Sequence, residues 1–65
     1  MIEYSNSRVT ELINEYVHLA RDRDILIDRF VNGLTFLELS DKYYLSERHV
    51  KRIVKKFDPV LIKYL

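Results

Sequence analysis

The apolar residues of this chain recur every three or four positions along nearly its whole length, and this spacing constrains the fold more than any other feature. It is typical of amphipathic α-helices and not of strands, in which apolar residues alternate. The 65 residues include one Gly and one Pro, so the chain has few of the residues that form tight turns between strands. We therefore predict an all-α fold, a compact single-domain bundle of four to five helices.

The first two helices are predicted at residues 7–20 and 23–31, where the apolar residues form continuous stripes. Asp22 and Asp24 favour a helix start because carboxylates interact well with the positive end of a helix. Gly33 is expected to end the second helix, since Gly readily adopts positive φ. One alternative stays open at the break, namely a single continuous bent helix.

Two short helices joined by a tight turn are predicted at residues 35–43 and 46–57. Thr35 and Ser46 each have a hydroxyl that can accept a backbone amide hydrogen bond at the start of the helix. Leu45 is expected to fill the turn. Such a pair is typical of a DNA-reading helix-turn-helix, whose second helix enters the major groove. The side chains expected in the core are Phe36, Leu37, Leu39, Tyr43, Val50, Ile53, Val54 and Phe57.

The last residues, 59–65, are predicted to form a short apolar tail. Pro59 suits the first position of a helix, so the tail could be a final turn or a short fifth helix. Its apolar content indicates that it either closes the core or pairs with a second copy. We favour the second alternative, because small DNA readers usually gain affinity by two-fold symmetry. The candidate dimer or partner surface consists of Val60, Leu61, Tyr64 and Leu65.

Charge is divided unevenly along the chain. Residues 1–45 contain five Lys or Arg and eight Asp or Glu, a balance of −3, whereas residues 46–65 contain six and two, a balance of +4, which together give +1. The positive charge is therefore concentrated in the predicted second helix of the pair. A basic face of this kind favours phosphate as a partner, although a merely solvated basic face is the alternative interpretation.

Residues 23–56 resemble region 4 of the sigma-70 family of factors and the related LuxR-type helix-turn-helix domains. The similarity rests on the charged start of the second helix, on Gly33-Leu34-Thr35 before the helix pair, on the small residue Ser40, and on Leu45-Ser46 before its second helix. It covers roughly half of the chain. The family usually has Gly in the turn where this chain has Tyr44, and a bulky residue in the left-handed conformation is strained by roughly 1 to 3 kcal/mol.

The resemblance also implies roles for individual residues. By family position, Glu47, Arg48 and Arg52 would read base edges, since Arg can donate two hydrogen bonds to guanine and Glu can accept one from cytosine. The backbone of the DNA would be contacted by Thr35, Ser46, Lys51, Lys55 and Lys56.

Other chemistry is not expected from these residues. The chain has no cysteine, only two histidines and no glycine-rich phosphate loop, so we expect no metal site, no cofactor and no enzymatic activity. The carboxylates of Asp22, Asp24 and Asp28 are explained by helix starts and by i,i+4 pairs with Arg. The apolar runs are too short for a bilayer and no leader is evident, so we expect a cytoplasmic protein with neither a membrane nor a small-molecule partner.

The expected function is therefore sequence-specific binding of double-stranded DNA by a small transcriptional regulator acting as a homodimer. The chain has no room for the further domain of a complete sigma factor, which favours a freestanding regulator of the kind found in phages and mobile elements. Two alternatives remain. One is a protein-interaction module that contacts RNA polymerase or another regulator through its first helix and tail, and the other is a phage packaging or anti-defence accessory.

Overall fold

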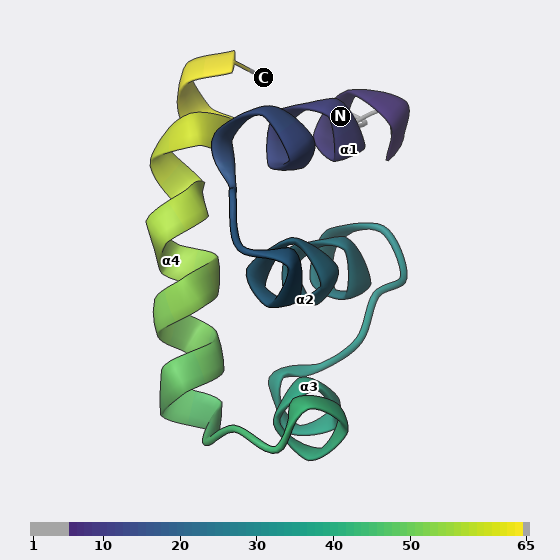
Figure 1. Cartoon of the computed structure of the whole chain (residues 1–65), viewed down its shortest axis with the longest axis vertical. Helices are drawn as coiled ribbons and strands as arrows, with labels where there is room; N and C mark the ends of the chain where they lie inside the picture. The colour runs from purple at the N-terminus through teal and green to yellow at the C-terminus, as the bar shows by residue number, and fades with distance from the viewer. Residues whose placement is uncertain (1–5, 65) are drawn as a thin grey trace.

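The computed structural model describes residues 6–64, and over that range it contains four α-helices and no strand. They are α1 (Asn6–Tyr16), α2 (Ala20–Phe30), α3 (Phe36–Tyr43) and α4 (Glu47–Tyr64). The first three helices lie one below the other along the length of α4 (Figure 1). The all-α fold is confirmed, and α3 and α4 form the predicted helix-turn-helix.

The core lies where the apolar stripes of the four helices meet. Leu39 of α3 is fully buried there, whereas Leu37, which we also expected in the core, is 59% exposed. The buried stripe of α3 follows Phe36, Leu39, Ser40 and Tyr43, and Leu37 lies a quarter of a turn beside it. The buried apolar residues are Val9, Leu12, Ile13, Ile25, Leu26, Leu39, Val50, Ile53, Val54 and Phe57.

The first two helices differ from the prediction in their bounds. α1 ends at Tyr16 instead of residue 20, and α2 begins at Ala20 instead of residue 23. Leu19 precedes α2 in an extended conformation (φ −79°, ψ 123°), so the chain breaks between the helices and does not form one bent helix. The acidic residue Asp22 lies in the first turn of α2, where it interacts favourably with the helix dipole.

The expected break at Pro59 is absent from α4, which continues to Tyr64 instead of ending at residue 57. Proline removes one backbone hydrogen bond and crowds the preceding turn. Packing compensates, because Val60 and Leu61 lie partly buried against the core and the Tyr64 ring stacks on Tyr16 at 5.3 Å between centroids. Two residues of the predicted tail therefore help to close the core, and Leu65 lies outside the described residues.

Candidate nucleic-acid interface

The start of α3 is fixed by a capping box. The Thr35 hydroxyl accepts a hydrogen bond from the Glu38 amide at 3.1 Å, and the Glu38 carboxylate accepts one from the Thr35 amide at 3.0 Å. The backbone and side-chain hydrogen bonds with Thr35 hold the pKa of Glu38 below its usual value. The predicted N-cap is confirmed, and the amides at the first two positions of α3 point out of the helix without intrahelical acceptors.

The turn between α3 and α4 keeps the left-handed conformation that the family's Gly would adopt. Tyr44 has φ 56° and ψ 41°, and its side chain is 94% exposed. The amides of Tyr44 and Leu45 both donate to the Ser40 carbonyl, which closes the end of α3. Leu45 is partly buried against the core, as expected, so the turn is compact although its central residue is strained.

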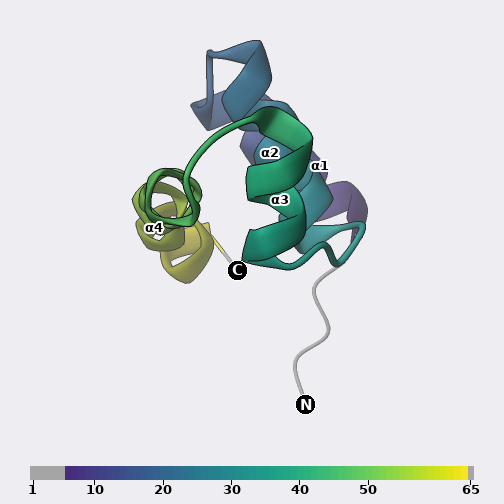
Figure 2. The ribbon, with the colours of Figure 1, turned by 90° about the horizontal axis from the view of Figure 1, so that it is seen from below.

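The first turn of α4 emerges directly from this tight turn. Figure 2 shows α4 end-on beside α3, with the short connection between them. The Ser46 hydroxyl accepts a hydrogen bond from the His49 amide at 3.1 Å, so Ser46 is the N-cap as predicted. Val50, Ile53, Val54 and Phe57 bury one side of α4, and the other side is exposed. That exposed side carries Glu47, Arg48, Lys51, Arg52, Lys55 and Lys56.

Arg29, in the last turn of α2, lies at the start of α3 together with Lys51 of α4. The sequence had not indicated that α2 contributes to the interface. The Arg29 guanidinium lies 4.4 Å from the centre of the Phe36 ring, and the Lys51 ammonium lies 5.6 Å from it. Arg29 also donates to the Leu34 carbonyl at 3.0 Å, which places it beside the entry to α3. Arg29 was not among the residues predicted from the sequence, because its contact with Phe36 joins two different helices. Arg29, Thr35 and Lys51 thus come from three different segments to one end of α3.

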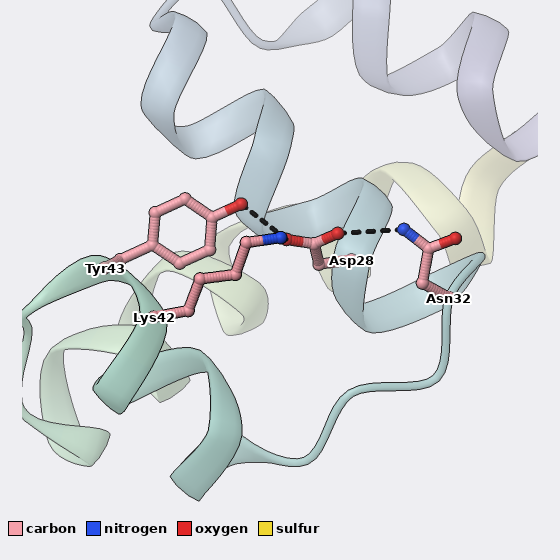
Figure 3. A network of polar contacts seen from close by, with 4 residues as sticks. All are labelled: Asp28, Asn32, Lys42 and Tyr43. Atoms are coloured by element: carbon pink, nitrogen blue, oxygen red, sulfur yellow. Dashed lines mark hydrogen bonds and ion pairs between the residues drawn. The ribbon is translucent and has the colours of Figure 1, made fainter.

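A buried carboxylate connects α2 to α3 (Figure 3). Asp28 is 7% exposed, and its carboxylate accepts three hydrogen bonds. The donors are the Lys42 ammonium at 2.7 Å, the Tyr43 hydroxyl, and the side-chain amide of Asn32 at 2.8 Å. Burial disfavours the charged form, but the three hydrogen bonds outweigh it and hold the pKa of Asp28 below its usual value. Burial and the bond to Asp28 raise the pKa of Tyr43.

Asp28 therefore has a different role from the one expected. We had explained it by an i,i+4 pair with Arg, but its partners Lys42 and Tyr43 lie on the next helix. Asp22 pairs with its neighbour Arg21 at 3.3 Å in an exposed contact. The Asp28 contacts fix α3 against α2, and because the turn is short they also set where α4 begins.

The fold and the basic side of α4 together define a helix-turn-helix DNA-binding domain. The family model of sigma-70 region 4 matches residues 20–56, which is more than half of the chain, and the chain belongs to this family. The match begins with the first residue of α2 and ends within α4, so it includes α3, the turn and the first part of α4 and leaves α1 outside. No curated protein and no solved structure matches the chain. None of the helices in the described part of the chain is long and apolar enough to cross a membrane.

Proposed function

We propose that this domain is a transcriptional regulator that reads a specific sequence in double-stranded DNA by placing the first turns of α4 in the major groove. The observation that carries the proposal is the exposed side of α4, where Arg48 and Arg52 lie opposite the buried stripe. A helix so oriented presents its side chains to base edges while its apolar side stays in the core. Binding is the whole activity in this proposal, and no residue is assigned a catalytic role.

The base contacts are assigned to Glu47 and Arg48, in the first turn of α4, and to Arg52, one turn further along its exposed side. Arg matches the two acceptors of guanine, and Glu accepts from cytosine while it repels phosphate. Glu47 therefore makes nonspecific binding weaker and specific binding more selective.

The phosphate contacts are assigned to both edges of this surface. Ser46 and Lys55 serve the backbone along α4, as expected from the sequence. At the start of α3, Arg29 and Lys51 flank the Phe36 ring, and the outward amides beside Thr35 add donors. Two cations and a helix N-terminus in one place suit a single phosphate group. Lys56, which the sequence also assigned to the DNA backbone, borders a groove between α4 and the connection from α1 to α2, and we assign it no phosphate contact.

Selection from a random pool of DNA duplexes tests the proposal. We expect one enriched motif. In a plot of log K for this motif against log[salt], each phosphate contact should contribute about −1 to the slope. A pool that stays unenriched, with only weak salt-sensitive binding, would contradict sequence-specific reading.

Three variants separate the assigned roles. Arg52→Ala should weaken binding by roughly 1 to 3 kcal/mol and relax the preference at one base pair. Lys55→Ala should weaken binding to all sequences and reduce the salt slope by about one. Arg8→Ala is the matched control, because it removes one exposed positive charge on α1, outside the helix-turn-helix and the proposed surface, and it should change neither property.

A protein partner is the second candidate, and one observation favours it. Leu37 on α3 and Tyr44 in the turn that follows it are both exposed apolar side chains. RNA polymerase or another regulator could contact this pair. In that case Tyr44→Ala and Leu37→Ala should reduce transcription of a reporter gene without changing DNA affinity, whereas Arg52→Ala should have little effect.

A further inference from the structure

A groove of about 300 Å³ lies between α4 and the region where α1 ends and α2 begins. Its lining comes from the end of α1, the connection from α1 to α2, α2 itself and α4. The connection runs beside α4 in Figure 1. The floor and walls are apolar and include Val17, Leu26, Ile53, Phe57 and Val60. Leu19, in the connection, also borders the groove and is 62% exposed. A large apolar side chain thus stands at the rim of an apolar groove.

We propose that this groove binds a second copy of the chain, with Leu19 of each protomer inserted into the groove of the other. A two-fold contact requires that one surface patch be complementary to itself. Leu19 and the groove meet this requirement because the protruding side chain and the space for it lie next to each other on one face. If the two had lain on opposite faces, they would have formed an open chain of molecules instead of a closed dimer.

The charged residues of the groove support the same occupant. Asp22 and Lys56 both border it, one from α2 and one from α4. Asp22 makes only an exposed contact with Arg21, so in a two-fold dimer it can also pair with Lys56 of the second copy, which would make two equivalent intermolecular pairs. The groove therefore offers a second copy one group of each charge next to the apolar rim and the apolar floor.

This dimer leaves the proposed DNA-reading surface free. The α4 residues that line the groove, Ile53, Lys56, Phe57 and Val60, form one stripe, while Lys51 lies on the side of α4 that faces Phe36. With a two-fold axis near Phe57 and antiparallel α4 helices, the two Arg48 positions would lie about 27 Å apart along the helices, of the same order as the 34 Å between half-sites. This step alone rests on the proposed function.

Sedimentation equilibrium of the full chain without DNA tests the proposal, from about 1 to 300 µM protein, the range expected for a small interface. We expect a monomer–dimer equilibrium, and Leu19→Asp should weaken it at least tenfold. Leu19 is the N-cap of α2 and makes no side-chain capping bond, whereas Asp there can accept one, so the variant should fold at least as stably. Leu37→Asp is the matched control, since Leu37 is equally exposed on α3, away from the groove, and should leave the dimer intact.

Charge reversal identifies the pairing across the two-fold axis. Asp22→Lys and Lys56→Asp should each weaken the dimer several-fold, and the double variant should restore it.

Three results would overturn the proposal. The first is a wild-type monomer at every concentration, and the second is a dimer unaffected by Leu19→Asp. The third is a monomer in which Ile2→Asp shifts the NMR resonances of the groove residues, which would assign the groove to the chain's own N-terminal segment. Because no DNA is present, each of these results leaves the DNA selection experiment to be judged separately.

Discussion

The α2–α3 junction and the α1–α4 end of the molecule are held together by different kinds of contact. At the junction, the buried carboxylate of Asp28 accepts directional hydrogen bonds from Lys42 and Tyr43. At the other end, apolar contacts and a partly exposed pair of tyrosines connect the helices, with Tyr16 stacked on Tyr64 and a hydrogen bond between their phenols. Hydrogen bonds constrain both distance and angle, whereas apolar contact is non-directional. The α2–α3 junction, which positions α3 and the start of α4, thus has the more numerous and more buried directional contacts, and the other end leaves apolar surface exposed.

Removal of the Asp28 carboxylate should have the largest effect. In Asp28→Ala the Tyr43 hydroxyl, partly buried, loses its acceptor and Lys42 loses its ion-pair partner, so we expect a loss of about 1 to 3 kcal/mol in the free energy of unfolding. Urea denaturation measures it. Asp24→Ala, an exposed change on the same helix, is the control and should stay within about 0.5 kcal/mol of the wild type. Equal stability of the two variants would remove the distinction between the junctions.

The same carboxylate makes stability depend on pH. The pKa of Asp28 is lowered in the folded state, so the unfolded state binds its proton more readily. The stabilisation is fully present above the unfolded pKa of about 3.9 and is lost as pH falls through the lower folded pKa. As the pH is lowered from neutral to acidic, the urea concentration at the unfolding midpoint should therefore fall less steeply in Asp28→Asn than in the wild type. Glu38→Gln removes the acid dependence of the capping box and serves as the comparison.

Much of the fold was predictable because its signals are local. The capping hydroxyls of Thr35 and Ser46 act within three residues, and the apolar stripe of α4 repeats within one turn. The exposed basic side of α4 followed from the same stripe, since residues opposite a buried face must be exposed. These parts of the candidate interface could be read from spacing alone.

The parts that sequence reasoning missed depend on residues far apart in the chain. Asp28 meets Lys42 and Tyr43 across fourteen and fifteen residues, and no helical period relates them. Continuation of α4 through Pro59 depends on packing of Val60 and Leu61 against the core, which overrides the local effect of proline. The Leu19 groove exists only because α1 ends earlier than its apolar stripe indicated.

The strained turn should give a smaller effect of opposite sign. Tyr44→Gly relieves the left-handed conformation, which costs roughly 1 to 3 kcal/mol, but adds backbone entropy of about 0.5 to 1 kcal/mol to the unfolded chain. We expect a net gain of about 1 kcal/mol in urea denaturation. Tyr44→Ala removes the ring but keeps the strain and should give no gain. Equal gains in both variants would attribute the effect to the exposed ring instead of the backbone.

The Tyr16–Tyr64 stack should show the smallest effect on stability, and its signature is a titration. The hydrogen bond between the phenols is the main cause of two opposite shifts, which raise the pKa of Tyr16 to about 12 and lower that of Tyr64. NMR titration of the tyrosine rings should therefore show Tyr64 ionising well before Tyr16. In Tyr16→Phe, Tyr64 should return toward the usual pKa near 10, while the urea midpoint stays nearly unchanged because the ring stays in place and only a hydrogen bond between two partly exposed phenols is lost. A large loss of stability in this variant would mean that the aromatic pair holds α1 against α4 as firmly as Asp28 holds α3 against α2, and the contrast between the two regions would fail.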